Sequence, residues 1–306
     1  MITFYDIKVN STDPAFTVSP FCWQARLCLN YKQLPYHTIY ALYSNVTAFA
    51  KKHGIPPTGV KPDGSPSYTL PAIHDSKTNA TVSDSFKIAR YLDETYPDTP
   101  AFFPIAIIPP TVGASVDVNL STDGKLDTRV LLAAWESMAT STVYPKVLKL
   151  NVGKLLARVE DSADSFPGGG FVESSQRKFE MVFGMRWDEL GKEPKLGEPV
   201  WKEAEEAVGI WLGLLEKSRG SSFRRDESDK DEFMKDKESL GTLESQRGLW
   251  VMGGQFTFAD AVVGAAFCWI RSVWGQDSEE WASVKTWGEG RWLEYIEGVE
   301  KYATIL

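Results

Sequence analysis

The chain has 306 residues, of which 43% are hydrophobic, and its 33 basic and 41 acidic residues give a formal net charge of −8. This length suffices for one or two hydrophobic cores and slightly favours two domains. The negative charge disfavours nucleic acids and anionic membrane surfaces as partners, so a small ligand is expected instead.

Three cysteines and three histidines narrow the class of protein further. An odd number of cysteines, with no charged and apolar leader before them, predicts a reducing, cytoplasmic location and no disulfide framework. The histidines and cysteines lack the spacing of a metal cluster, so no metal is expected. No apolar run approaches the ~20 residues that span a bilayer, and no membrane contact is expected.

The first hundred residues predict an α/β unit, because segments rich in β formers alternate with segments whose apolar residues recur at helical spacing. The expected strands are residues 2–7, 36–43, 70–74 and 80–82. The expected helices are residues 21–31, 44–53 and 84–96. Residues 56–67 predict a loop rich in proline and glycine, and a turn at 75–79 makes the last two strands a hairpin.

The remainder of the chain predicts a helical domain, since no strand is expected after Pro110. The expected helices are residues 126–143, 176–190, 200–217, 258–274 and 287–303. We therefore expect an α/β domain at 1–100, a linker at 101–124 and an all-helical domain at 125–306. A charged insertion around 218–247 is expected to be solvated and to take no part in catalysis.

The segment VSPFC at residues 18–22 opens the first expected helix. Serine followed by proline is typical of a helix start, with the hydroxyl as the N-cap. The same segment also fits a redox Cys-x-x-Cys motif without its first cysteine, or an active site built around a hydroxyl. Cys22 and Cys28 lie on different faces of one helix and cannot pair, whereas Cys28 and Cys268 are expected in the core.

Four motifs make the chain resemble the glutathione transferases over nearly all of its length. Ser19-Pro20-Phe21-Cys22 is similar to the Ser-Pro-Phe of the tau class and the Cys-Pro-Phe of the omega class. Residues 69–73 (TLPAI) resemble the family's cis-proline segment, and residues 84–92 (DSFKIARYL) its Glu/Asp-Ser helix. Residues 257–260 (TFAD) resemble the capping box of the C-terminal domain. Segments 4–6, 25–32 and 91–97 most resemble the fungal etherase-related FuA class.

This resemblance implies a thioredoxin-like domain followed by a C-terminal helical bundle, with glutathione as co-substrate and no metal. It implies that the Ser19 hydroxyl stabilises the glutathione thiolate and that Phe21 and Cys22 are also glutathione-binding residues. A free thiol has a pKa of roughly 8.5, and lowering it by ~2 units takes ~2.7 kcal/mol. A hydroxyl donor and a helix N-terminus can supply much of that free energy.

The resemblance also assigns residues to the rest of the tripeptide. A cis Leu70-Pro71 bond would let the Leu70 backbone pair with the cysteinyl part, as an added strand does. Asp84 would hold the γ-glutamyl ammonium and Ser85 the neighbouring carboxylate, although Asp84 also fits the role of a helix cap alone. For the glycyl carboxylate the first candidate is Lys52, followed by Lys51, His53 and Lys61.

The implied function is the transfer of glutathione to electrophilic, hydrophobic or aromatic compounds, as in detoxification. The second substrate would lie against the helical domain, where Trp135, Met138 and Tyr144 form a candidate apolar wall. Two alternatives stay open. One is a ligandin-type carrier of aromatic or polyphenolic molecules with little turnover, and the other is a glutathione-dependent β-aryl etherase. The resemblance also implies a homodimer.

Overall fold

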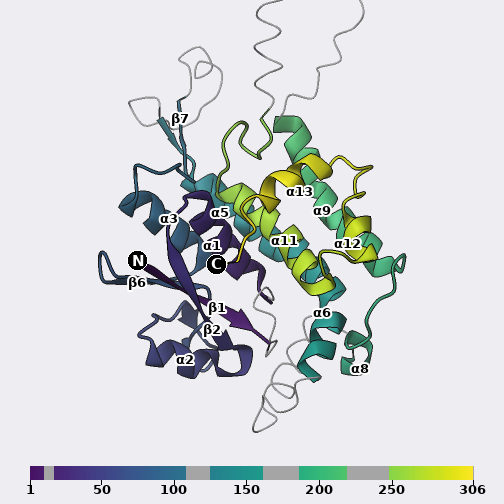
Figure 1. The fold of residues 1–306 in the computed structure, drawn as a ribbon, viewed down its shortest axis with the longest axis horizontal. Helices are drawn as coiled ribbons and strands as arrows, with labels where there is room; N and C mark the ends of the chain where they lie inside the picture. Colours follow the sequence, from purple (N-terminus) through teal and green to yellow (C-terminus); the bar gives the residue numbers. More distant parts are fainter. Residues whose placement is uncertain (10–16, 108–124, 161–185, 219–247, 306) are drawn as a thin grey trace, which may run out of the picture.

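A mixed four-stranded sheet in the order β2–β1–β5–β6 forms the centre of the N-terminal half (Figure 1). The computed structural model describes residues 1–9, 17–107, 125–160, 186–218 and 248–305. β1 (Ile2–Lys8) runs parallel to β2 (Tyr36–Leu42) and antiparallel to β5 (Ala72–Asp75), which pairs with β6 (Ala80–Ser83). The four predicted strands and the hairpin of the last two are confirmed.

Three helices connect and cover this sheet. α1 (Pro20–Tyr31) joins the two parallel strands, α2 (Val46–Lys52) follows β2, and α3 (Ser85–Thr95) follows β6. α1 and α3 pack against each other, whereas α2 lies on the opposite side of the sheet (Figure 1). The predicted α/β unit is therefore confirmed, and both ends of each helix lie within two residues of the predicted ends.

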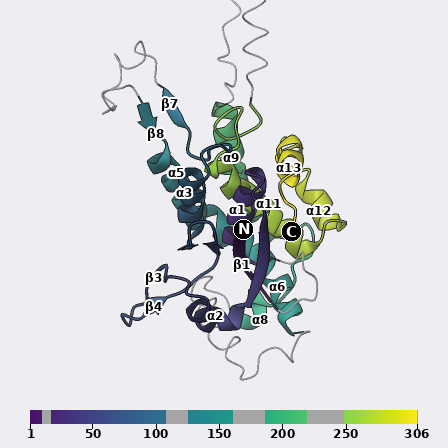
Figure 2. The ribbon, with the colours of Figure 1, turned by 60° about the vertical axis from the view of Figure 1, so that its left-hand side comes forward.

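Two short ladders are not evident from the sequence. β3 (Gly59–Val60) and β4 (Pro66–Ser67) pair within the predicted loop. β7 (Ile105–Ile107) pairs with β8 (Lys125–Asp127), so the prediction of no strand after Pro110 is wrong. Figure 2 shows both ladders extending away from the packed elements. Strands of two or three residues are too short to carry an alternating pattern and depend on their partner's backbone hydrogen bonds.

The C-terminal half is helical, with α11 (Phe258–Trp274) running through its middle (Figure 1). α11 is buried along nearly its whole length and contacts α5, α6, α12 and α13. The other helices are α5 (Arg129–Met138), α6 (Tyr144–Glu160), α8 (Trp187–Leu190), α9 (Pro199–Ser218), α12 (Glu279–Val284) and α13 (Leu293–Glu300). The predictions at 200–217 and 258–274 are confirmed by α9 and α11.

α5 and α6 form one helical run joined by a π-helical turn at Ala139–Val143. The prediction of a single helix at 126–143 is therefore wrong at both ends, since α5 begins at Arg129 and the run continues to Glu160. Pro145 is the second residue of α6. Because Pro145 lies within this continuous run, its missing N–H removes one backbone hydrogen bond, which favours an irregular turn just before it.

The predicted helix at 287–303 is wrong at both ends, since only α13, at Leu293–Glu300, lies within it. α12, at Glu279–Val284, is a separate helix that the sequence analysis does not predict. Gly288, Glu289 and Gly290 between them have φ values of 60°, 62° and 78°. Residues in these left-handed conformations cannot belong to a right-handed helix, so the helix predicted to begin at residue 287 begins only after them. Glu289 in this conformation gives no signal in the sequence, because a charged residue is common inside exposed helices.

Two predictions extend outside the described residues. The helix predicted at 176–190 is described only from residue 186, where α8 occupies its last residues. The charged insertion predicted around 218–247 lies almost entirely outside the described part of the chain. Both therefore stay predictions.

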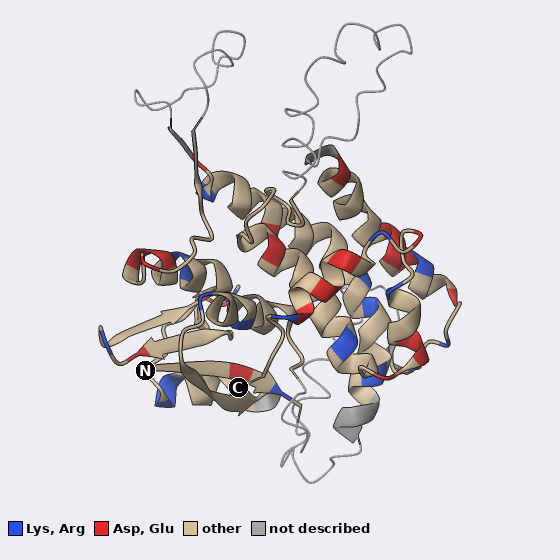
Figure 3. Ribbon diagram, turned by 45° about the horizontal axis from the view of Figure 1, so that its top comes forward, with Lys and Arg blue, Asp and Glu red and all other residues tan. Residues whose placement is uncertain are grey.

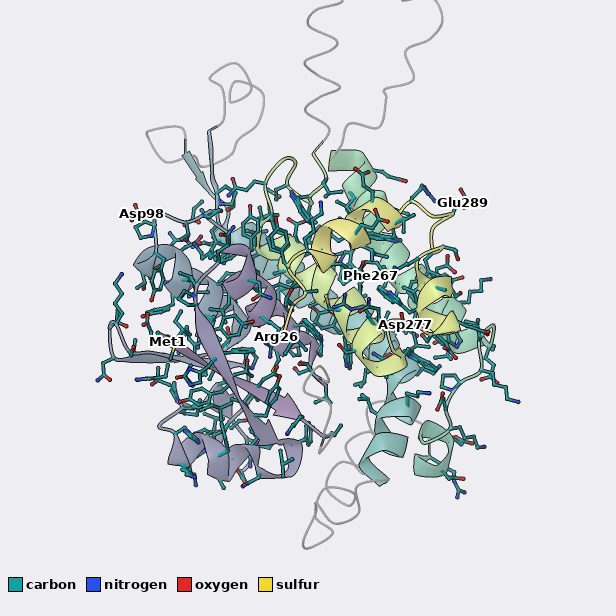
Figure 4. All side chains as sticks on the ribbon, viewed as in Figure 1. Met1, Arg26, Asp98, Phe267, Asp277 and Glu289 are labelled. Carbon is teal, nitrogen blue, oxygen red and sulfur yellow. The ribbon has the colours of Figure 1, made fainter. Side chains whose placement is uncertain are left out.

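α1 and α11 pack against each other and join the two halves. A Cβ added at Gly264 of α11 would lie 2.8 Å from Val299 and 3.3 Å from Leu27 of α1, so glycine allows this close approach. On the other face of α1, Arg26 lies in the interior (Figure 4) and forms a fully buried ion pair with Asp6, at 2.7 Å. Removing one partner of such a pair costs about 3–5 kcal/mol.

The predicted capping box at the start of α11 is confirmed. The Thr257 N–H and hydroxyl both donate to Asp260 Oδ2, at 2.8 and 2.9 Å, and the Val251 N–H donates to Oδ1 at 2.7 Å. Asp260 is fully buried, so these hydrogen bonds replace the water it loses. The box fixes the start of the central helix.

Acidic and basic positions are interleaved along the exposed helices (Figure 3), and several of them pair, as Lys149 does with Glu203 at 3.0 Å. The described part of the chain contains no helix with both the length and the apolar character needed to cross a membrane.

Candidate active site

Ser19 lies at the start of α1, where the sequence predicts a cap. It has an extended backbone conformation (φ −121°, ψ 125°), and its Oγ accepts a hydrogen bond from the Cys22 N–H at 3.4 Å. Pro20 is the first helical residue. The predicted helix start is thus confirmed. Ser19 is only half-buried, so its side chain is also accessible from a neighbouring cavity.

That cavity has a volume of about 400 Å³ and lies between the two halves of the molecule. The N-terminal half contributes Ser19, Phe21 and Leu70 to its lining, and the helical half contributes Tyr144 and Leu148 among others. Most of the lining is aliphatic or aromatic, and we call this space the apolar cavity. A serine hydroxyl at a helix N-terminus therefore faces a space suited to hydrophobic molecules.

Tyr144 contributes its ring to the wall of the apolar cavity. Its ring packs edge to face on Phe21, with centroids 5.5 Å apart. Its hydroxyl donates to the Val262 carbonyl at 2.9 Å and accepts from Gln24 at 2.7 Å, and burial raises the pKa of this phenol. The hydroxyl is consequently engaged within the protein, and Tyr144 offers an aromatic surface to a ligand.

A second cavity, also of about 400 Å³, lies at the start of α3. Asp84, Ser85 and Glu136 line it, and we call it the polar cavity. Phe21 and Thr140 line both cavities, so the two adjoin. An elongated ligand with one charged end and one apolar or sulfur-containing end fits such a pair of spaces.

Asp84 is the N-cap of α3, and its carboxylate accepts a hydrogen bond from the Lys87 N–H at 3.0 Å. Its φ of +86° is uncommon for a residue other than glycine, and such conformations cluster at functional sites. The Asp84 N–H donates to the Pro71 carbonyl at 3.2 Å, which ties the start of α3 to the Leu70-Pro71 segment.

Glu136 of α5 faces the start of α3. The Ser85 hydroxyl donates to Glu136 Oε1 at 3.2 Å. Burial first, and then the negative charge of Asp84, raise the pKa of Glu136 to about 7, although the Ser85 hydrogen bond partly opposes them. The polar cavity thus holds a second carboxyl group, Glu136, whose ionisation is disfavoured by burial and by the nearby Asp84.

The structure brings five of the predicted ligand residues to the two cavities. Ser19, Phe21 and Leu70 line the apolar cavity, while Asp84 and Ser85 line the polar one, again with Phe21. The Leu70-Pro71 bond is cis, as the resemblance implied. Pro71 itself is buried and lines neither cavity.

The remaining predicted ligand residues lie elsewhere. The Cys22 side chain has no exposed surface and lines neither cavity, and burial followed by the charge of Asp6 raises the pKa of its thiol well above the usual value. Its side chain thus belongs to the hydrophobic core, and a role for Cys22 in glutathione binding stays a prediction. Lys52 is exposed on α2 and lines neither cavity, nor do Lys51, His53 and Lys61.

The predicted aromatic wall is only partly formed as expected. Tyr144 lines the apolar cavity, but Trp135 and Met138 pack against the hydrophobic core instead. Residues that the sequence reasoning missed complete the site, namely Tyr43, Glu136, Thr140 and Trp269. Glu136 and Thr140 belong to the helical half and meet α3 and α1 only through tertiary packing, so no motif near them marks their role.

Comparisons with known proteins identify the family of this chain. Residues 18–95 match the family model "Glutathione S-transferase, N-terminal domain" and residues 224–302 match "Glutathione S-transferase, C-terminal domain", together just over half of the chain. A glutathione S-transferase-like protein, ustS, of Aspergillus flavus is 36% identical over 104 residues, which are 32% of this chain and 37% of that protein.

Solved fungal structures match over the whole chain. Glutathione transferase GSTFuA2 of Phanerochaete chrysosporium is 29% identical with a TM-score of 0.69, covering 100% of this chain and 99% of its own. A glutathione S-transferase of Ceriporiopsis subvermispora, solved in complex with glutathione, is 28% identical with a TM-score of 0.69, covering 100% and 98%. A second transferase of that fungus, also in complex with glutathione, is 27% identical with a TM-score of 0.71, covering 98% of both chains.

Proposed function

This chain belongs to the glutathione S-transferase family, whose co-substrate is glutathione, and on that premise we propose that it transfers glutathione to electrophilic hydrophobic compounds. The observation that carries the proposal is the position of Ser19, which caps α1 and faces the apolar cavity. Attack requires the thiolate form of glutathione. A hydroxyl donor beside the positive end of α1 favours that form.

We propose that glutathione spans the two adjoining cavities. Its thiol lies beside Ser19, its cysteinyl backbone beside Leu70, and its γ-glutamyl end beside Asp84 and Ser85. The adjoining linings support this arrangement, because Phe21 belongs to both cavities and leaves one continuous path between their polar and apolar ends. The Lys52 side chain is exposed on α2 and lines neither cavity, so its position does not support a direct contact with the glycyl carboxylate.

The second substrate is proposed to occupy the apolar cavity. Aliphatic side chains of α6, such as Leu148 and Val152, and the rings of Tyr144 and Trp269 line its helical side. A space of about 400 Å³ with few polar groups suits an aromatic molecule of moderate size. Attack by the thiolate on an electrophilic carbon forms a thioether bond, and the displaced group leaves with the electron pair of its broken bond.

The same apolar cavity also favours a second candidate function, the binding of aromatic or polyphenolic molecules with little turnover. Steady-state assays with glutathione and a chlorinated nitrobenzene, beside titrations with a fluorescent aromatic dye, separate the two. Conjugation that needs Ser19 supports the enzyme, whereas tight dye binding without conjugation supports the carrier. Calorimetry with glutathione tests the enzyme separately, because absence of glutathione binding would overturn glutathione transfer but not the binding of aromatic molecules.

We also propose a homodimer in which a second copy covers α5. Val130 and Leu131 on this helix are 78% and 51% exposed, which is unusual for adjacent large aliphatic residues. Light scattering should give twice the chain mass, and Leu131→Lys should halve it. A wild-type protein that stays monomeric at high concentration would contradict the proposal. A cytosolic location is proposed as well, because glutathione must stay reduced to act as the nucleophile.

A further inference from the structure

Glu136 lies on the helical half but faces the start of α3 across the polar cavity. Only one of its carboxylate oxygens, Oε1, is engaged within the described residues, through the Ser85 hydroxyl. Asp84 is similar, since its Oδ1 accepts the Lys87 N–H and its Oδ2 has no hydrogen bond within the same part of the chain. Each carboxylate thus keeps an oxygen for a ligand.

The polar cavity has no positive side chain among its described lining residues, and Asp84 and Glu136 are its two charged groups. The other titratable groups that influence or face Glu136 are Cys28 of α1 and Tyr144 of α6. Burial raises the pKa of both, so the thiol and the phenol are neutral near pH 7. A cationic ligand group between Asp84 and Glu136 would relieve their mutual repulsion.

The same cavity also offers donors for an anion. The backbone N–H groups of Ser85 and Phe86 are in the first turn of α3 and have no intrahelical partner. A helix N-terminus favours a carboxylate at this position. Two carboxylates next to two free N–H groups are complementary to the ammonium and carboxylate that an α-amino acid carries on one carbon.

We propose that Glu136 binds the γ-glutamyl ammonium of glutathione together with Asp84, and so acts as a positioning residue supplied by the helical half. This inference rests on the proposed function, and it adds a residue of the helical half to the residues proposed to bind the γ-glutamyl end. It also gives the Ser85 hydroxyl a defined role, which is to orient the Glu136 carboxylate while the backbone N–H groups receive the ligand carboxylate.

The test compares two ligands that differ only in the ammonium group. S-methylglutathione has no ionisable thiol, and its desamino analogue carries a glutaryl group in place of the γ-glutamyl group. Glu136→Gln should weaken S-methylglutathione binding about 10-fold or more, since hydrogen bonds to charged groups contribute roughly that much. It should change binding of the desamino analogue by less than about 2-fold. Glu94→Gln on α3, where Glu94 is 58% exposed, removes the same charge and should affect neither ligand.

A second measurement needs no variant. Since the pKa of Glu136 is raised to about 7, wild-type affinity for S-methylglutathione should rise between about pH 6 and pH 8, while affinity for the desamino analogue stays flat. Equal losses for both ligands in Glu136→Gln, or parallel pH profiles, would show that Glu136 only supports the fold of the site. Failure of the wild type to bind S-methylglutathione at all would overturn the proposed function as well.

Discussion

Replacing Ser19 by alanine tests whether its hydroxyl stabilises the glutathione thiolate. A hydrogen bond to a charged acceptor contributes roughly 1.5–3 kcal/mol, and ~1.4 kcal/mol corresponds to one pKa unit. Ser19→Ala should therefore raise the pKa of the bound thiol by about 1–2 units. At a fixed pH below that pKa, kcat should fall by about 10-fold or more, because the thiolate fraction falls in proportion.

The same substitution also removes the cap of α1, and this effect must be separated from the first. The hydrogen bond from the Cys22 N–H to Ser19 Oγ is long, at 3.4 Å, so the loss of stability should be near the low end of the usual ~0.5–2 kcal/mol. Ser19→Thr keeps both the hydroxyl and the capping oxygen. It is therefore the matched control for the thiolate and for the helix start.

Ultraviolet titration of the enzyme–glutathione complex measures the pKa of the bound thiol directly, and thermal unfolding measures the lost cap. We expect Ser19→Ala to shift the titration while glutathione affinity at low pH changes little, since the thiol is then neutral. A titration that is the same in wild type and Ser19→Ala, with only a lower melting temperature, would reduce Ser19 to a helix cap.

Two further predictions concern the cavity and the capping box. Leu148→Trp should fill part of the apolar cavity and so weaken the binding of a hydrophobic second substrate about 10-fold. Calorimetry should show no change in glutathione affinity. Equal losses of affinity for both ligands would contradict separate subsites. Asp260→Ala should lower the free energy of unfolding by about 2 kcal/mol or more, because the buried N–H groups of Val251 and Thr257 lose their acceptor. Burial raises the pKa of Asp260 to about 6, above the ~3.9 of an unfolded chain, so its own contribution to stability is greatest below about pH 4 and falls as the pH rises toward 6. Urea unfolding of wild type and variant across this range checks the sign, and a wild-type contribution that grows with pH would contradict it.

Much of the N-terminal half could be predicted because its signals are local. Ser19 before Pro20 and Asp84 before a helical pattern are caps whose hydrogen bonds reach only three residues along the chain. The strands around them carry enough β formers to be found by composition. For the same reason, the resemblance to glutathione transferases rests on short contiguous motifs in this half.

The helical side of the site could not be predicted in this way. Glu136 faces Ser85, 51 residues earlier in the chain, and their meeting depends on how α5 packs beside α3. The π-helical turn at Ala139–Val143 brings Thr140 to both cavities, yet its residues look like an ordinary helix with a nearby proline. Aromatic character alone does not distinguish a residue of the cavity wall from a residue of the core, because large rings are stabilising in both places. Trp135 is predicted in the wall for this reason but packs against the core.

The outcome of Ser19→Cys depends both on the local helix start and on the tertiary packing around Cys22. A thiol introduced at the start of α1 should have a depressed pKa and attack glutathione disulfide, forming a mixed disulfide at position 19 and releasing one glutathione thiolate. In the sequence, Cys22 is three residues away and looks suited to resolve that adduct, since residues at i and i+3 share a helix face. In the structure, its thiol has no exposed surface and a pKa raised well above the usual value by burial and by Asp6.

We therefore expect Ser19→Cys to gain thiol transfer by a route that uses one protein cysteine, with a second glutathione thiolate resolving the adduct. Reduction of a glutathione mixed disulfide should appear in Ser19→Cys and persist in Ser19→Cys with Cys22→Ala, while conjugation falls in both. Mass spectrometry should detect one glutathione per chain on residue 19. Loss of thiol transfer on adding Cys22→Ala, in a protein that still unfolds cooperatively, would show that Cys22 leaves the core during turnover. No adduct in either variant would mean that residue 19 does not face the glutathione sulfur.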